Sequence, residues 1–278
     1  MTICTEFAPA KINLSLRVGP LEDDGYHPID SRVAFADFGD VLVFEPADQL
    51  YLEITGPFAG ELPVQDNNLI LQAARALART SGISKGARIQ LTKNLPVSSG
   101  IGGGSADAAA TLRGLNRLWD CQLKLSELAT IGASFGSDIP ACLHGGWLRM
   151  RGRGERIENL PPEASFAAVL VNPGIAVSTA QVFGRFDQRL APEQFGATEH
   201  QNDLSQAAIS LCPQIADVLQ ALLEICEGAN RPIMCGSGAT CLAGFSSQDG
   251  ARKAARDLQE NHPNWWIQPV TIGQAPPL

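Results

Sequence analysis

A glycine-rich stretch at residues 96–106, with the sequence PVSSGIGGGSA, is the part of the chain best suited to bind a phosphate. Four of the five residues from Gly100 to Gly104 are glycine, so the backbone there can approach another molecule closely. A predicted strand, ARIQLT, precedes the stretch, and an alanine-rich segment with apolar residues at helical spacing follows it. The amides and the dipole of a helix N-terminus favour an anion. The alternative is a tight turn in front of a closely packed helix.

The stretch does not match two familiar phosphate-binding motifs. GxxxxGK[ST] requires a lysine that is absent here. GxGxxG, counted from Gly100 or Gly102, has Ser105 or Asp107 in place of its last glycine. We therefore expect a phosphate loop of another kind, with Ser105 as the candidate N-cap of the helix.

Two charged residues, Lys11 and Asp138, also have surroundings that suggest chemistry. Lys11 interrupts an otherwise apolar predicted strand, and a buried lysine is costly unless it is paired. The alternative is a solvent-facing lysine on an edge strand. Asp138 lies in GSDIP, after a predicted helix and before an extended turn favoured by Pro140. An aspartate in such a place more often serves as a helix cap or a turn residue.

The elements that must position these residues indicate an α+β protein of two halves. KINLSLRV predicts one strand, and DVLVFEP and LYLEITG predict a neighbouring pair of strands joined by residues 46–49. Helices are expected in DNNLILQAARALART, after the glycines, and from Ser126 to Gly136. A Pro-Pro pair at 161–162 marks the expected boundary, which divides the chain into residues 1–160 and 161–278.

Composition excludes several classes of function. A net charge of −8 and a pI of about 5.0 disfavour nucleic acid as a partner. No apolar stretch is long enough to cross a bilayer, and the N-terminal residues do not resemble a signal peptide, so we expect a cytoplasmic protein without a membrane partner. The seven cysteines form no CxxC and the four histidines no HxxxH, which favours reduced, mostly buried thiols over zinc or disulfides.

Four stretches resemble, in order, the motifs of the GHMP family of small-molecule kinases. They cover nearly the whole chain and read APAKINLSL with DDGYHPI, PVSSGIGGGSADAAATL, FGSDIPACLHGG and MCGSGATCLAGF. Ser98 and Ser99 depart from the family pattern, which commonly has glycine or alanine there, and Cys235 stands where serine is common. Together with NPGIAVSTAQVF, these stretches are most similar to the branch that phosphorylates the 2-hydroxyl of a cytidine diphosphate methylerythritol.

The resemblance implies a GHMP kinase fold, with an N-terminal half like ribosomal protein S5 domain 2 and a ferredoxin-like C-terminal half. The active site is expected in the cleft between them. Asp138 would accept the proton of the attacking hydroxyl, and Lys11 would keep Asp138 ionised and offset the charge on the transferred group.

The resemblance also implies ATP and Mg²⁺ as cofactors, with Ser105 as a candidate magnesium ligand. Asn68 and Lys93 are expected to contact the nucleoside, although a helix-surface role and a strand-end role suit them nearly as well. The loop residues expected to hold ATP are Pro96, Val97, Ser98, Ser99, Gly100, Ile101, Gly102, Gly103, Gly104, Ser105 and Ala106.

For the acceptor, the resemblance places cytosine between Tyr26 and Phe183, with a hydrogen bond from His27. Packing at a strand end is the alternative for Tyr26 and His27. Asn13 and Thr179 would contact the polar part of the substrate. Gly236, Ser237 and Gly238 would border the phosphates from the second half.

Two other functions remain open at this point: another GHMP kinase of homoserine, sugar or mevalonate type, and a non-catalytic GHMP-like binding protein. We expect a monomer or a weak homodimer with a small-molecule substrate. If the glycines bring the backbone to phosphate, Gly103→Val should weaken ATP binding far more than it weakens folding.

Overall fold

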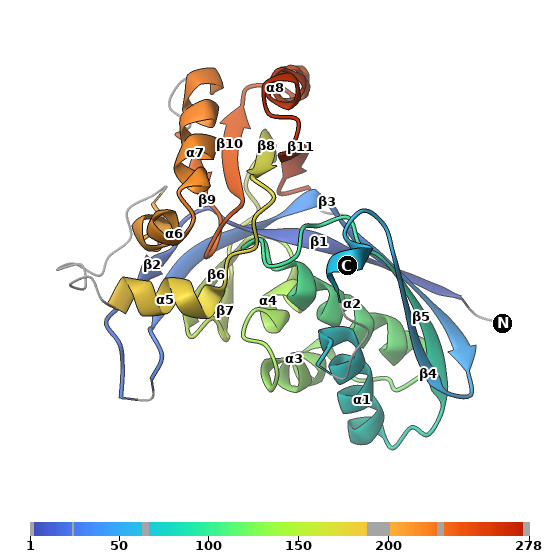
Figure 1. Cartoon of the computed structure of the whole chain (residues 1–278). Coiled ribbons are helices and arrows are strands. Elements are labelled where there is room, and N and C mark those ends of the chain that lie inside the picture. Colours follow the sequence, from blue (N-terminus) through green and yellow to red (C-terminus); the bar gives the residue numbers. More distant parts are fainter. Residues whose placement is uncertain (1–2, 24, 63–66, 188–200, 227–230, 275–278) are drawn as a thin grey trace.

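The computed structural model describes residues 3–23, 25–62, 67–187, 201–226 and 231–274, whose helices and strands are shown in Figure 1. The strands are β1 Cys4–Asn13, β2 Arg17–Val18, β3 Ile29–Ala47, β4 Leu50–Thr55, β5 Gly86–Thr92, β6 Leu148–Gly152, β7 Arg156–Asn159, β8 Phe166–Asn172, β9 Ile233–Met234, β10 Cys241–Phe245 and β11 Trp266–Ile272. The helices are η1 Ala59–Glu61, α1 Leu69–Ser81, α2 Gly103–Leu118, α3 Leu125–Ala133, α4 Ile139–His144, α5 Thr179–Asp187, α6 Ser205–Leu211, α7 Gln214–Ile225 and α8 Gln248–Asn261.

The strands pair into one continuous sheet along the path β4-β5-β3-β11-β8-β10-β9. β1, β2 and β6 also pair with β3, and β7 pairs with β6. β3 is 19 residues long, and this length lets it pair with β1, β2, β5, β6 and β11. The two halves meet where Ile272 of β11 pairs with Ala36 of β3.

The second half has the ferredoxin-like arrangement expected from the sequence. Its strands follow the order β11-β8-β10-β9 and pair antiparallel, and the helices α7 and α8 connect them in a βαββαβ succession. In Figure 1, α7 and α8 lie on the side of β8 and β10 away from the first half. The α+β class and the ferredoxin-like second half are thereby confirmed.

The first half packs α1, α2, α3 and α4 together on one side of the long strands β1 and β3 (Figure 1). α1 begins where the Asn68 side chain accepts a hydrogen bond from the Ile70 amide, and it ends at Gly82 in the left-handed conformation. α2 carries a run of small residues from Ala106 to Ala110 that is buried against its neighbours. This close packing brings the N-terminus of α2 near the sheet.

Two expectations about the strands were wrong. β3 and β4 are not neighbours, because β5 pairs antiparallel with β3 and parallel with β4 and so lies between them. β5 follows α1 in the chain and occupies the position next to β3 in the sheet. The segment KINLSLRV does not form one strand either: β1 ends at Asn13, and β2 starts at Arg17. Between them, the amides of Leu14 and Ser15 both donate to the Arg32 carbonyl, which breaks the ladder.

Three clusters of buried apolar side chains form the interior. One lies between α1–α4 and the first-half strands, and a second lies between α5–α8 and the second-half strands. The third contains Leu95 and Ile101 from the glycine-rich region together with Leu242 and Val270 from the second half. Residues 160–165 have no helix or strand, but the expected division after residue 160 remains a prediction.

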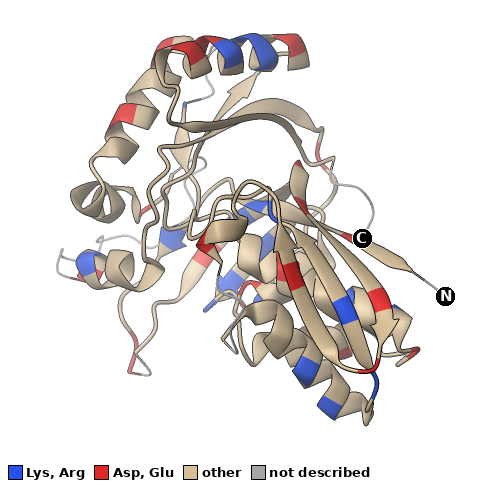
Figure 2. Cartoon of the chain, turned by 45° about the vertical axis from the view of Figure 1, so that its right-hand side comes forward, with Lys and Arg blue, Asp and Glu red and all other residues tan. Residues whose placement is uncertain are grey.

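All seven cysteines are free thiols, and four of them are buried. No helix in the part of the chain described here is long and apolar enough to cross a membrane. Figure 2 shows Lys and Arg interspersed with Asp and Glu on helices and strands alike.

We predict that Gly114→Ala destabilises the protein, although alanine is the better helix former. A β-carbon at Gly114 of α2 would lie 2.6 Å from Cδ2 of Phe44, a buried ring of β3. Overpacking of this kind costs about 1–3 kcal/mol. At Gly104 of the same helix, the β-carbon would meet its nearest neighbour, Leu69 Cδ1, at 3.4 Å. Denaturant unfolding should therefore show a lower free energy for Gly114→Ala and no loss for Gly104→Ala; equal stabilities would contradict this packing.

Candidate active site

Lys11 and Asp138 form an ion pair, with 2.9 Å between Lys11 Nζ and Asp138 Oδ2. Lys11 is 4% exposed, which excludes the solvent-facing alternative. The Asp138 side chain is 32% exposed, so a ligand can reach the carboxylate. The structure thus brings together the two residues to which the sequence assigned the chemistry.

The backbone of Lys11 lies between strand β3 and the glycine loop. The pairing of β1 with β3 shifts register between Pro9 and Lys11, and the Lys11 amide donates to the Ile101 carbonyl at 2.9 Å. A β-carbon at Gly102 would lie 3.0 Å from Lys11 Cβ. The glycine loop therefore lies directly against the lysine.

Asp138 precedes α4, and its own backbone is helical, with φ −85° and ψ −13°. The residues that follow it form this helix and not the extended turn that the sequence suggested. Pro140 is accommodated because the first turn of a helix does not need its amide hydrogen. The Asp138 side chain makes no capping bond to α4. The position is that of a cap, but the carboxylate turns to Lys11 and is available for proton transfer.

The glycine loop enters α2 at Gly102, so the expectation that Ser105 caps this helix was wrong. Gly102 is the N-cap in the left-handed conformation, with φ +67°, and its carbonyl accepts from the Ala106 amide at 2.9 Å. Ser105 lies inside the first turn. No side chain of the described residues caps this end of α2, which leaves its first amides for an anionic ligand.

The other end of the loop packs on the second half. The Ser98 carbonyl accepts from the Val177 amide, and the Ser99 carbonyl accepts from the Thr240 amide. A β-carbon at Gly100 would lie 2.7 Å from the amide nitrogen of Gly238. Close backbone contact therefore connects the loop to the turn that contains Gly236, Ser237 and Gly238.

Ser237 and Thr179 lie together at this turn, with 2.8 Å between their hydroxyl oxygens. The Asn202 amide group donates to the carbonyls of Met234 and Gly236, both at 2.7 Å, and so holds the turn. The structure thus brings Thr179, Ser237 and the two glycines of this turn to the edge of the glycine loop.

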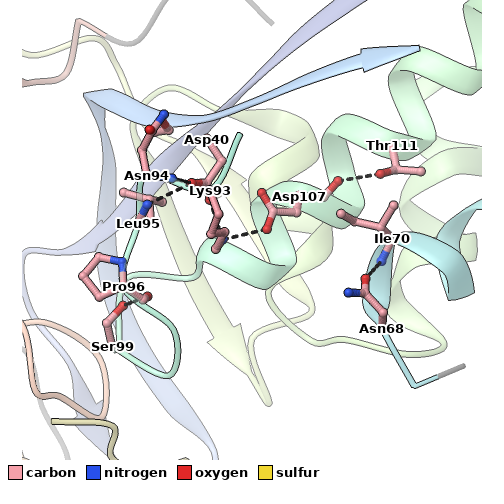
Figure 3. A network of polar contacts seen from close by, with 11 residues as sticks. Asp40, Asn68, Ile70, Lys93, Asn94, Leu95, Pro96, Ser99, Asp107 and Thr111 are labelled. Carbon is pink, nitrogen blue, oxygen red and sulfur yellow. Dashed lines mark hydrogen bonds and ion pairs between the residues drawn. The ribbon is translucent and has the colours of Figure 1, made fainter. Parts of the chain in front are cut away.

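Lys93 does not face a surface that a nucleoside could contact. Its ammonium is 2.5 Å from Asp40 Oδ2 and 2.7 Å from Asp107 Oδ2, and the residue is 2% exposed (Figure 3). Asp40 also accepts hydrogen bonds from the amides of Asn94 and Leu95. This buried cluster supports the end of β5 and the start of the loop, because it binds the chain on both sides of Pro96.

The cluster contains one cation and two carboxylates. Burial raises the pKa of Asp107 from 3.8 to about 8; Lys93 opposes the shift, and the charge of Asp40 adds to it. The other carboxylate oxygen of Asp107 is buried with no hydrogen-bond partner among the described residues, which also disfavours the ionised form. Burial alone would lower the pKa of Lys93, but the two carboxylates outweigh it and raise that pKa.

Gly103 lies against this cluster, since a β-carbon there would be 3.1 Å from Lys93 Nζ. Valine at Gly103 would therefore disturb a buried ion cluster as well as a ligand. Gly104 is exposed and has more room, so it is the better position to test the loop.

Asn68, the other predicted nucleoside contact, has a structural role at the start of α1. Its side-chain oxygen accepts a hydrogen bond from the Ile70 amide (Figure 3).

Of the aromatic residues predicted to bind a base, Phe183 lies against His27. Phe183 of α5 stacks on the His27 ring with centroids 5.6 Å apart and planes at 30°. His27 donates from Nδ1 to the Gly19 carbonyl at 2.7 Å, and its Nε2 lies 2.5 Å from Asp187 Oδ1. Tyr26 is 54% exposed, and the Arg153 guanidinium covers its ring.

Asn13 lies two residues after Lys11 in β1 and is 2% exposed. Its amide group donates to Ser31 Oγ at 2.7 Å, and its Oδ1 has no hydrogen-bond partner among the described residues. A buried acceptor without a partner is costly, so Asn13 is suited to accept a hydrogen bond from a ligand hydroxyl.

Sequence reasoning missed Asp40, Asp107 and Arg153. The one signal for the two aspartates was Lys93 itself, because a lysine expected in a strand end needs acidic partners if it is buried. Nothing in the spacing of these residues shows that they meet.

The chain is similar to several known proteins. Residues 68–146 match the family model of the GHMP kinases N terminal domain. A protein of Paramagnetospirillum magneticum named 4-diphosphocytidyl-2-C-methyl-D-erythritol kinase is 45% identical, over 98% of this chain and 99% of its own length. One of the same name from Cereibacter sphaeroides is 47% identical, over 96% and 98%. A crystal structure of 4-(cytidine 5'-diphospho)-2C-methyl-D-erythritol kinase is similar with a TM-score of 0.81 and 30% identity, covering 98% of this chain and 100% of that one.

We predict that stability falls as the pH rises towards 8 because of Asp107. With its pKa raised to about 8, the folded protein keeps a proton that the unfolded chain has released. The free energy of unfolding therefore decreases with pH between the two pKa values. Asn at position 107 does not titrate, so the stability of the wild type should fall relative to Asp107→Asn from about pH 5 to about pH 8. Denaturant titrations across this range measure the difference, and parallel pH profiles would contradict a protonated Asp107.

Proposed function

Because the chain belongs to the 4-diphosphocytidyl-2-C-methyl-D-erythritol kinase family of GHMP kinases, we propose that Lys11 and Asp138 mark the place where it phosphorylates its acceptor. The chain is an ATP-dependent small-molecule kinase. It transfers the γ-phosphoryl group of ATP to the 2-hydroxyl of 4-diphosphocytidyl-2-C-methyl-D-erythritol, in the non-mevalonate route to isoprenoid precursors. The observation that supports this site is the ion pair beside the glycine loop.

In the proposed mechanism, Asp138 accepts the proton of the acceptor hydroxyl as its oxygen attacks phosphorus. The Lys11 ammonium, 2.9 Å from Asp138 Oδ2, holds this carboxylate in place beside the glycine loop. The Lys11 side chain lies against Gly102, and its ammonium would stabilise negative charge on the transferred group. Phosphoryl transfer depends mainly on positioning and electrostatic stabilisation, and these residues provide both.

ATP supplies the phosphoryl group, and the residues of the loop suit its phosphates. Gly102, Gly103 and Gly104 present backbone without side chains at the uncapped start of α2. Gly236 and Gly238 border the same loop from the second half. We propose that Lys93 stabilises the loop through its buried ion pairs with Asp40 and Asp107 and does not contact the nucleoside.

The residues present also suit Mg²⁺ bound chiefly through phosphate. No three His, Cys, Asp or Glu side chains gather into a metal site within the described parts of the chain. Mg²⁺ commonly takes one or two protein ligands and fills the remaining positions with phosphate oxygens and water. Ser105 is the proposed ligand: its Oγ would lie 4.0 Å from a β-carbon at Gly136, just before Asp138.

For the acceptor, we propose that the cytosine enters between Tyr26 and Phe183, beside His27. The stacked pair of His27 and Phe183 supports an aromatic subsite here. Thr179 would contact the polar part of the substrate near Ser237, and the unpartnered Oδ1 of Asn13 would accept from a hydroxyl.

The proposal also covers the location, oligomeric state and partners of the enzyme. ATP and Mg²⁺ are supplied in the cytoplasm, where we propose that the enzyme acts as a monomer or weak homodimer, without nucleic acid or membrane. The acidic net charge of −8 supports the absence of a nucleic-acid partner.

We predict that the purified protein with ATP and Mg²⁺ phosphorylates the cytidine substrate and not homoserine, galactose or mevalonate. Asp138→Asn should reduce kcat by about 10²- to 10⁴-fold, because general-base catalysis contributes this much. Binding of ATP should remain, since Asp138 does not lie in the loop. Phosphorylation of another acceptor would overturn the substrate, and unchanged kcat in the variant would overturn the assigned base.

A second prediction concerns the loop. Gly104→Val should leave the fold intact, because Gly104 is exposed and its β-carbon would make only an ordinary contact with Leu69. The valine methyls would occupy the space in front of the first α2 amides, and ATP affinity should fall about tenfold or more, equivalent to 1.4 kcal/mol.

Gly184→Val is the matched control, since Gly184 is an exposed helical glycine with nothing within 4 Å of its β-carbon position. Calorimetric titration with ATP should give wild-type affinity for this control. Equal affinity in both variants would refute the role of the glycines.

A further inference from the structure

Arg113 of α2 is bonded to both of the elements that position the candidate ion pair. α2 packs against β1, which contains Lys11, and against α4, which directly follows Asp138 (Figure 1). The side chain of Arg113 is largely buried, with 11% of its surface exposed. Each of its three nitrogen atoms has a different partner, and these partners lie in β1 and α4.

Two of these contacts hold β1. Arg113 Nε donates to Oε2 of Glu6 at 2.9 Å, and Nη2 donates to the Phe7 carbonyl, also at 2.9 Å. Glu6 is buried, so its carboxylate needs a cation beside it. Among the described strands, β1 pairs with β3 alone. Arg113 therefore gives β1 a second attachment, which lies four residues before Lys11.

The third contact holds α4. Arg113 Nη1 donates to the Cys142 carbonyl at 3.1 Å. α4 has six residues, so this carbonyl lies in its last turn, where a helix does not supply partners for all of its carbonyls and a cation is favourable. The Cys142 amide in turn donates to the Asp138 carbonyl at 3.1 Å. A chain of hydrogen bonds therefore connects Arg113 to the backbone of Asp138.

A guanidinium suits this position because its donors lie in one plane and point in fixed directions. Lysine in its place would keep a charge beside Glu6, but a single ammonium would not direct bonds to the two carbonyls as well. Burial lowers the pKa of Arg113 to about 10, so the group is still charged at neutral pH. Burying a charge is unfavourable, and the three contacts of Arg113 offset that cost while they join β1 to α4.

The relative position of β1 and α4 determines the geometry of the proposed reaction. The contact of 2.9 Å between Lys11 Nζ and Asp138 Oδ2 joins a side chain of β1 to one that precedes α4. A displacement of a catalytic group by about 1 Å, caused by a change far from the chemistry, can lower the rate about 10²-fold. Residues that fix these two elements therefore affect the chemical step without touching a substrate.

We propose that Arg113 is a positioning residue for phosphoryl transfer, which joins β1 to α4 and so keeps Lys11 and Asp138 in the arrangement that the reaction requires. This inference rests on the proposed function and adds a residue that acts through the backbone of both elements. Because the partners of Arg113 are Glu6 and two backbone carbonyls, its loss should slow the chemical step and leave the binding of both substrates unchanged.

The test compares Arg113→Lys with the control Arg117→Gln. Arg117 donates to Oε1 of Glu6 and to the Thr5 carbonyl, both in β1, and its side chain is 58% exposed. For Arg113→Lys we expect kcat for the cytidine substrate to fall about 10- to 100-fold, with KM for ATP and for the acceptor within about twofold of the wild type. Arg117→Gln should keep the kcat of the wild type, because an exposed ion pair contributes little.

Expressing kcat per ATP-binding site separates positioning from a loss of folded protein. Calorimetric titration with ATP gives the fraction of molecules that bind, and kcat is divided by this fraction. A fall in kcat that disappears after this correction would show that Arg113 only stabilises the fold, and it would overturn the proposal. An unchanged kcat, or a rise in KM alone, would overturn it as well.

A pair of double variants provides the test if Arg113→Lys does not fold. Glu6→Gln/Arg113→Gln removes both buried charges together and leaves neither of them unpaired, and Glu6→Gln/Arg117→Gln is its matched control. The proposal requires a lower kcat per binding site in the first variant than in the second, and equal values would refute it. Failure of the wild type to phosphorylate the cytidine substrate would instead overturn the proposed function, whatever Arg113 does.

Discussion

Backbone contacts without room for side chains hold the two halves of this site together. A β-carbon at Gly100 would overlap the Cys235 carbonyl, and one at Gly236 would overlap the Gly100 carbonyl. Gly102 lies in the same way against the Lys11 side chain. The glycines therefore serve the protein's own packing as well as a ligand. Without them the loop could not lie against Lys11 and the second half at the same time, and the ion pair with Asp138 would lose its neighbour.

The glycine loop packs on a buried polar cluster. Lys93 lies between Asp40 and Asp107, and the cluster adjoins Gly103. Two carboxylates near bound phosphate would repel it if both were ionised. The raised pKa of Asp107 means that one of them keeps its proton, so the cluster is close to neutral beneath the proposed ATP site. Burial therefore provides rigidity without placing a net negative charge beneath the loop.

The sequence was informative where a feature is local. The glycine loop, the helix after it and the four motif stretches could be recognised from consecutive residues. Contacts between distant residues could not be predicted: the burial of Lys11 depends on a register shift in β1, and the partners of Lys93 come from β3 and α2. The helix start was placed at Ser105 because serine is a common cap, but Gly102 adopts the left-handed conformation and begins the helix three residues earlier. The order of the strands in the sheet also depends on distant contacts, since β5 lies between β3 and β4, which are adjacent in sequence.

The position of β11 in the sheet has a consequence for how the protein is made. β11 lies between β3 and β8, so a strand near the end of the sequence joins the first half to the second. On the ribosome, the glycine loop emerges long before Cys235–Gly238 and β11 are synthesised. A nascent chain that ends at residue 160 contains Lys11, the loop and Asp138, but lacks the backbone against which the loop packs. Contacts so far apart in sequence form slowly, and the site is completed only in the last stage of folding.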